Sequence, residues 1–174
     1  LEFRRVLFRS LRLQNNEVFI DCGAYNGDSI GAFMQEVVNQ GVEMPEKIVG
    51  FEPDAGNFSQ LCDNTRQWPF CQPVQKGVWE NKTVLSFQSG NALSSRLVEQ
   101  SSDTVTIELD SIDNILQGGK ATFIKMDVEG AELKALQGAA GTIRAWHPLL
   151  AISLYHKPED LLTIPQYIQS LSAD

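Results

Sequence analysis

Four almost continuous apolar runs punctuate the chain, at residues 18–20, 48–51, 122–126 and 149–155. A strand with one solvent-exposed face alternates apolar and polar residues, whereas a parallel strand that is covered on both faces does not. The four runs therefore predict parallel strands that are buried between layers of helices.

Apolar residues at helical spacing separate these runs. After the first run they recur three or four positions apart until Gly41, at Ile30, Phe33, Met34, Val37 and Val38. A weaker helical pattern begins after Pro53 and Asp54, and a long one covers residues 130–146. Strands that alternate with helices and are joined by right-handed crossovers predict an α/β fold, with helices on both faces of a mostly parallel sheet.

The middle of the chain departs from this rhythm. Residues 83–87 and 104–109 alternate apolar and polar positions, which predicts strands with one exposed face that extend or border the main sheet. The tail from residue 157 is predicted to be helical and to be interrupted by Pro165. No segment remains for the last strands of a doubly wound sheet, so we expect the sequence to be truncated at its C-terminal end.

Charge and cysteine content narrow the possible partners. The net charge of −8 at pH 7 opposes binding to nucleic acid or to an anionic membrane surface. No apolar run approaches the roughly 20 residues that span a bilayer, and no signal-peptide pattern opens the sequence. The three cysteines are far apart and fit neither a disulfide framework nor a zinc-ligand pattern. We therefore expect a soluble, cytoplasmic protein whose partner is a small molecule.

Residues 1–10 differ in character from the rest of the chain. They begin without a methionine and are rich in arginine, whereas the remainder is acidic. We interpret them as a linker-like leader outside the fold, with a basic amphipathic helix as the alternative. Residues 11–174 then form a single domain, which is the usual size for one hydrophobic core.

The segment between the first strand and its helix has the composition of a ligand-binding loop. Gly23 and Gly27 let the backbone approach a bound group without a Cβ in the way. Asp21 and Asp28 flank them and would repel the pyrophosphate of a dinucleotide, whose GxGxxG pattern is missing. S-adenosylmethionine carries positive charges and no phosphate, and Glu52 after the second strand is placed to bind ribose hydroxyls. A plain tight turn and a solvated Glu52 are the alternatives that involve no ligand.

Four segments together resemble the FkbM-type S-adenosylmethionine-dependent methyltransferases: FIDCGAYNGDS, VGFEPD, VTIELDSI and FIKMDVEGAELKALQGA. The resemblance covers about residues 17–156. It implies a Rossmann-like class I methyltransferase fold, here without the family's final β-hairpin, and methylation of hydroxyl oxygens on sugars, polyketides or other small metabolites. It also implies cofactor contacts at Asp21, Gly23, Ala24 and Gly27 for the methionine moiety, at Glu52 for the ribose, and beside the adenine at Gly77 and Val78, which end a predicted third strand (73–78).

The candidates for catalysis follow the last two apolar runs. Lys125 and Asp127 share one side of their strand by period-two alternation, and the resemblance places Asp127 opposite the transferable methyl group. Glu129 is a candidate for the acceptor site. His156 is a candidate general base or acceptor-binding group, because an imidazole in water changes its charge near neutral pH. A Lys–Asp pair that only satisfies polar groups at a strand end, and a structural histidine, are the alternatives.

Other polar residues are predicted to lie outside the reaction centre. Glu132 is expected to complement the positive N-terminus of the helix over 130–146, and His147 is expected to face away from the site. No clustered set of His, Asp and Glu residues indicates an obligatory metal ion. A polar middle loop that could close over a ligand carries Ser94, Ser95 and Arg96.

The resulting hypothesis is a methyltransferase that uses S-adenosylmethionine and acts on a hydroxyl of a small molecule. One alternative is an NAD(P)-dependent oxidoreductase of the same architecture, which the missing GxGxxG pattern argues against. The other is a non-catalytic Rossmann-like interaction module, which the intact Asp21, Gly23, Gly27 and Glu52 argue against.

Overall fold

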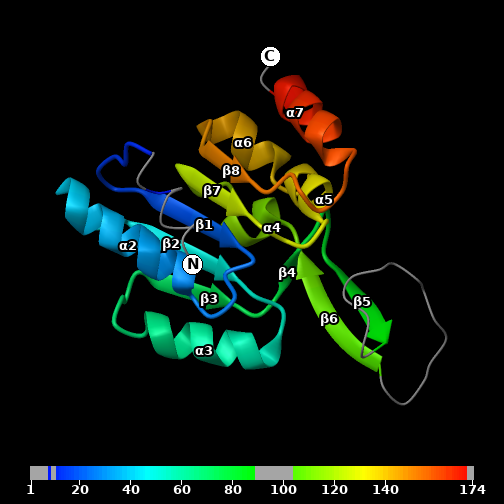
Figure 1. Cartoon of the computed structure of the whole chain (residues 1–174), viewed down its shortest axis with the longest axis horizontal. Coiled ribbons are helices and arrows are strands. Elements are labelled where there is room, and N and C mark those ends of the chain that lie inside the picture. Colours follow the sequence, from blue (N-terminus) through cyan, green and yellow to red (C-terminus); the bar gives the residue numbers. More distant parts are fainter. Residues whose placement is uncertain (1–7, 9–10, 89–103, 172–174) are drawn as a thin grey trace.

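The computed structural model describes residue 8, residues 11–88 and residues 104–171, and its centre is a parallel sheet between two layers of helices (Figure 1). The five strands of this sheet are β1 (Val18–Cys22), β2 (Lys47–Phe51), β3 (Cys71–Val74), β7 (Phe123–Met126) and β8 (Leu149–Ile152). Their order is β3-β2-β1-β7-β8, so the direction of chain progression reverses between β1 and β7. This is the Rossmann-like α/β arrangement that the apolar runs predict.

Helices cover both faces of the main sheet, and alternation along β1 sends side chains to each face. Phe19 packs among residues of α2 (Asp28–Gln40) and α3 (Ala55–Thr65). Val18 and Ile20 pack on the opposite face. That face is covered by α4 (Ile112–Leu116), α5 (Glu132–Gln137), α6 (Ala140–Trp146) and α7 (Asp160–Leu171).

An aromatic cluster fills the core on the α2 side of the sheet. The ring centroids of Phe19 and Phe33 are 4.5 Å apart, and those of Phe19 and Phe123 are 4.9 Å apart. Phe8 packs edge-on against all three rings and is 1% exposed. Phe8 belongs to the predicted leader, so exclusion of this residue from the fold is wrong. The other leader residues, 1–7 and 9–10, lie outside the described residues.

A smaller second sheet stands beside the carboxyl ends of the main strands (Figure 1). It contains β4 (Gly77–Val78), β5 (Thr83–Gln88) and β6 (Thr104–Asp110), in the order β4-β6-β5. β5 and β6 are antiparallel to each other, and they form this separate sheet instead of extending the main one as predicted. The predicted third strand over 73–78 is wrong as one element, because the backbone turns after Val74, where the Lys76 N–H donates to the Val74 carbonyl at 2.9 Å. Gly77 and Val78 therefore belong to the second sheet.

Two helical predictions also need correction. The predicted helix over 130–146 is divided at Gly138 into α5 and α6. At this residue the backbone packs against the loop after β4, since a Cβ on Gly138 would lie 2.0 Å from the Trp79 carbonyl oxygen. α7 instead continues through Pro165, which was predicted to interrupt it.

The described residues contain neither a disulfide bond nor a helix suited to span a membrane. Cys22, Cys62 and Cys71 are all free thiols. No helix among the described residues has both the length and the apolar character to cross a bilayer.

Candidate functional site

A cavity of about 420 Å³ opens at the carboxyl ends of β1, β2 and β7, where the strand order reverses. Open parallel sheets bind their ligands at this position. Its lining combines polar or glycine positions with an apolar wall. The first group contains Gly23, Tyr25, Glu52, Asn57, Gly77, Asp127 and Glu129, and the second contains Phe51, Pro53, Val78, Trp79, Leu85, Ile107, Leu109, Val128 and Ala131.

Gly23 brings the loop after β1 into direct contact with the end of β7. Its φ of +80° is left-handed, and its N–H donates to the Phe51 carbonyl oxygen at 3.1 Å. A Cβ at this position would lie 2.1 Å from the Asp127 carbonyl oxygen. Only glycine therefore permits this approach between loop and strand.

The other predicted residues of this loop, Ala24, Gly27 and Asp28, lie outside the cavity lining. Ala24 is fully buried, and Gly27 has a φ of +87° at the residue that precedes α2. Neither these two residues nor Asp28 line the cavity. Their predicted cofactor contacts stay predictions.

Asp21 and Lys125 form a buried ion pair under the same loop. The Lys125 Nζ lies 2.9 Å from Asp21 Oδ1 and donates to the Gly23 carbonyl oxygen at 3.1 Å, while the Ser29 hydroxyl donates to the other Asp21 oxygen. Asp21 has no exposed surface, and neither charged residue lines the cavity. The pair compensates its two charges and fixes the loop. The predicted contacts of Asp21 with a cofactor and of Lys125 with the reacting atoms stay predictions.

Glu52 occupies the cavity wall at the end of β2 and is 7% exposed. One carboxylate oxygen accepts from the Tyr25 N–H at 2.9 Å and the other from the Asp54 N–H at 3.0 Å. Burial raises the pKa of Glu52 above its ordinary value, against the opposing effect of these two hydrogen bonds. Each oxygen retains a lone pair for a further donor, such as a ligand hydroxyl.

Gly77 and Val78 line the cavity from β4, and their predicted place beside an adenine stays a prediction. A Cβ on Gly77 would lie 2.5 Å from the Leu109 side chain, so the small residue brings β6 close. Val78 is 3% exposed. The resulting surface is apolar and suits a flat ring.

Asp127 stands at the cavity where β7 ends, and two residues that follow β8 approach it. The Tyr155 hydroxyl donates to Asp127 Oδ1 at 2.8 Å, and His156 Nε2 lies 3.5 Å from the same oxygen. Burial raises the pKa of Tyr155, and the contact with Asp127 raises it further. The predicted neighbours Asp127 and His156 are therefore brought together.

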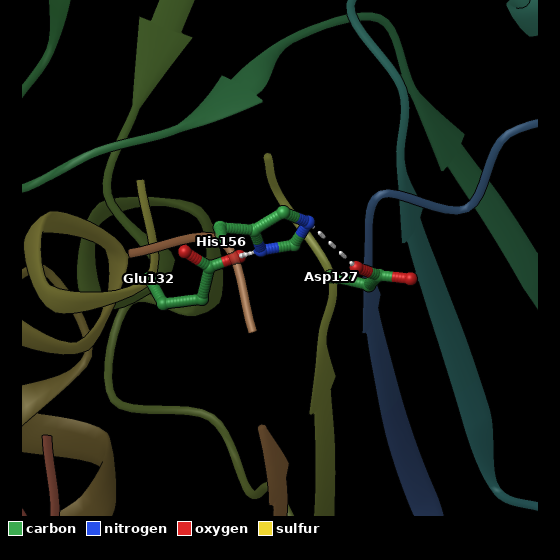
Figure 2. Close-up of side chains that lie close together, drawn as sticks. All are labelled: Asp127, Glu132 and His156. Carbon is green, nitrogen blue, oxygen red and sulfur yellow. Dashed lines mark ion pairs between the residues drawn. The ribbon is translucent and has the colours of Figure 1, made fainter. Parts of the chain in front are cut away.

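Figure 2 shows the imidazole of His156 between the carboxylates of Glu132 and Asp127, and the carboxylate of Glu129 also approaches it. Nδ1 is 2.8 Å from Glu132 Oε1, and Nε2 is 3.4 Å from Glu129 Oε2. Glu132 is fully buried and also accepts from the Val128 N–H at 3.0 Å. Its predicted place at a helix start is correct, but the sequence reading missed its contact with His156.

Sequence reasoning also missed Tyr155 as a site residue and the cavity-lining Tyr25, Asn57 and Trp79. A usable signal existed for Tyr155 and Glu132. The carboxyl ends of adjacent parallel strands share one edge, so a residue at the end of one apolar run, such as Tyr155, can become a neighbour of residues that come soon after the adjacent run, such as Glu132. No comparable pattern marked the other three residues.

Two predictions concern residues away from this cluster. His147 is exposed and precedes β8, whereas His156 follows the same strand, so the two histidines lie at opposite ends of it. The predicted closing loop with Ser94, Ser95 and Arg96 lies outside the described residues.

Known proteins share both the sequence pattern and the fold. The model of the "Methyltransferase FkbM domain" family matches residues 21–172. The crystal structure of Methyltransferase FkbM from Methylobacillus flagellatus KT is similar with a TM-score of 0.74 and 32% identity, over 92% of this chain and 39% of that one. Hexuronic acid methyltransferase AglP of Haloferax volcanii is 26% identical over 103 residues, which are 56% of this chain and 43% of AglP. The chain thus spans less than half the length of either relative.

The family match includes all of the cavity-lining residues, from Gly23 to Ala131, and also the segment after β8. The similar crystal structure shares the overall fold. The chain belongs to the FkbM methyltransferase domain family.

Proposed function

We propose that this protein is an S-adenosylmethionine-dependent methyltransferase that acts on a hydroxyl group of a small molecule. The observation that carries the proposal is the convergence of Gly23, Glu52 and Asp127, from the ends of three different strands, on one cavity. A sugar hydroxyl is the acceptor class that we favour, because one of the similar proteins is named as a hexuronic acid methyltransferase.

The cavity residues fit the chemistry of this cofactor. Glu52 offers acceptor oxygens for ribose hydroxyls, and the apolar wall beside Val78 offers a surface for adenine. Asp127 and Glu129 place negative charge at the cavity, which favours a sulfonium and an ammonium group and disfavours a pyrophosphate. The same charges argue against a dinucleotide-dependent oxidoreductase.

When bound, the cofactor supplies a methyl group whose transfer to a hydroxyl oxygen breaks the carbon–sulfur bond, leaves that electron pair on sulfur and releases the hydroxyl proton. Much of the rate of such a displacement comes from alignment of the reacting atoms. Asp127 and His156, 3.5 Å apart, are proposed to orient the hydroxyl and to accept its proton. Tyr155 holds Asp127 in place through its hydrogen bond.

Titration calorimetry with S-adenosylmethionine tests the proposal. We expect saturable binding with one molecule per chain. Substitution of Glu52 by alanine should weaken binding at least tenfold, or about 1.4 kcal/mol, because the ribose acceptor is lost. The control is Glu43→Ala, an exposed carboxylate far from the cavity, which should leave binding unchanged. The proposal fails if the folded protein shows no measurable binding heat.

A further inference from the structure

Negative charge accumulates around His156. The carboxylates of Asp127, Glu129 and Glu132 lie within 3.5 Å of its ring nitrogens. Asp160, 4% exposed, is a fourth carboxylate nearby, and its pKa is raised by burial and by the charge of Glu132. Lys157 is close, but its ammonium group donates to the Gly130 carbonyl oxygen. The described residues therefore leave this cluster with more negative than positive charge.

Neither ring nitrogen of His156 has a partner in good hydrogen-bond geometry among the described residues, although Nδ1 lies 2.8 Å from Glu132 Oε1. The side chain is only 10% exposed, so water compensates little for the missing partners. The acidic oxygens nearest to Nε2 are Glu129 Oε2 at 3.4 Å and Asp127 Oδ1 at 3.5 Å. These contacts are too long for good hydrogen bonds.

The same separations suit donors that share a metal ion. Two ligand atoms that each lie about 2.1 Å from an ion, at a tetrahedral angle, are about 3.4 Å apart. Each of the two carboxylate oxygens therefore lies at the spacing of a metal co-ligand from Nε2. Asp127 and Glu129 both line the cavity, so an ion bound there would adjoin it.

Glu132 has a different part in this arrangement. It approaches Nδ1, at the edge of the ring opposite to Asp127 (Figure 2), so one ion cannot bind both carboxylates through the same nitrogen. A carboxylate at the second imidazole nitrogen is the usual partner of a metal-bound histidine, because it fixes the tautomer and the ring orientation. With the proton on Nδ1, facing Glu132, the Nε2 lone pair is free for a metal.

We propose that His156 Nε2, Asp127 and Glu129 form a binding site for a divalent transition-metal cation, with Glu132 as the carboxylate that orients the imidazole. An imidazole donor favours Mn²⁺, Fe²⁺ or Zn²⁺ over Ca²⁺ and Mg²⁺, which prefer all-oxygen sites. Three protein ligands leave coordination positions open toward the cavity.

The consequence for catalysis rests on the proposed methyltransferase function. A hydroxyl oxygen bound to the cation loses its proton more readily, and that proton passes to solvent. His156 and Asp127 then act as metal ligands, and they no longer need to accept the proton themselves. The acceptor would be a molecule whose hydroxyl can coordinate the ion, such as a sugar.

The chain offers a direct test, because it has two histidines. Mn²⁺ broadens the NMR signals of nearby nuclei, so we expect sub-stoichiometric Mn²⁺ to broaden the imidazole signals of His156 while those of His147 stay sharp. The variant His147→Asn assigns the two sets of signals, since asparagine tolerates the left-handed backbone at this residue, where φ is +46°. Equal broadening of both histidines, or none up to millimolar Mn²⁺, overturns the proposal.

Two matched variants separate coordination from general charge attraction. Glu129→Gln should raise the Mn²⁺ concentration needed for half-maximal broadening about tenfold or more, because it removes a ligand. Glu159→Gln removes an exposed carboxylate that is near Asp160 but outside the proposed ligand set, and should change that concentration less than about twofold. Equal effects of the two variants also overturn the proposal.

These measurements need neither S-adenosylmethionine nor an acceptor, so their outcome is separate from that of the calorimetric test. Selective broadening without cofactor binding would remove the proposed methyltransferase function and leave the metal site. Cofactor binding without selective broadening would remove the metal site and leave the proton to Asp127 and His156.

Discussion

At the scale of single residues, Gly23 determines whether the loop after β1 can lie against the end of β7. Gly23→Ala adds a Cβ 2.1 Å from a backbone oxygen and imposes a side chain on a φ of +80°. We expect this variant to lose about 2–4 kcal/mol of unfolding free energy, measured by urea denaturation with tryptophan fluorescence.

The control for this prediction is Gly31→Ala. Gly31 lies inside α2, and a Cβ there meets no atom within 4 Å. This variant should gain about 0.5–1 kcal/mol, because alanine is the better helix former. Similar losses in both variants would contradict the role assigned to Gly23.

The sequence identified residues that a local motif marks and missed those defined by contacts between distant segments. Gly23, Glu52 and Asp127 each follow a predicted strand, and all three line the cavity. Asp21 belongs to the same sequence segment as Gly23. Its side chain is nevertheless buried against Lys125, and its position in the sequence did not reveal this contact. The contact of Glu132 with a residue beyond β8 depends on how α5 packs.

At the scale of helices and strands, apolar runs located four of the five main-sheet strands. β1, β2 and β7 are almost entirely buried, as the runs predict, whereas β8 lies at the sheet edge and is only partly buried. The sequence predicts least accurately those element boundaries that depend on contacts with distant segments. The helical pattern over 130–146 is continuous in sequence, yet Gly138 packs against the Trp79 backbone and divides it. Residue periodicity contains no information about a partner so distant along the chain.

A charged contact joins the turn after β3 to the end of β6. Lys76 Nζ lies 2.7 Å from Asp110 Oδ2, and the Asp110 side chain is 6% exposed. Burial opposes ionisation of Asp110, but hydrogen bonds from Lys76, Asn114 and Ser111 outweigh it and lower its pKa. We expect Asp110→Asn to lose about 1–3 kcal/mol of unfolding free energy at pH 7.

The pH dependence of this loss has a defined sign. The folded-state pKa lies below the ordinary 3.8, so the unfolded chain takes up the proton first as pH falls. The stabilisation is fully present above that ordinary pKa and disappears as pH falls through the folded-state value. Denaturation of both proteins from pH 7 downward checks this. Asp63→Asn, at an ion pair with both side chains exposed, should change stability by less than about 1 kcal/mol.

At the scale of the whole molecule, the core extends into the N-terminal segment through Phe8. Its ring packs on three other phenylalanines from β1, α2 and β7. Phe8→Ala should lower the unfolding free energy by about 3–5 kcal/mol, because it leaves a cavity in this cluster. Leu162→Ala, at a residue that is 69% exposed, is the control and should have little effect in thermal unfolding. If Phe8→Ala leaves the unfolding free energy unchanged, residue 8 lies outside the stable core.

The pocket draws its walls from two sheets that are hydrogen-bonded separately. Gly23, Glu52 and Asp127 belong to the ends of the parallel sheet, whereas Leu85, Ile107 and Leu109 belong to the smaller one. Substitutions on β5 and β6 should therefore change the shape of the cavity without disturbing the hydrogen bonds of the parallel sheet. The antiparallel pair β5–β6 can therefore vary in sequence and change the shape of the cavity while the ends of the parallel strands keep their positions.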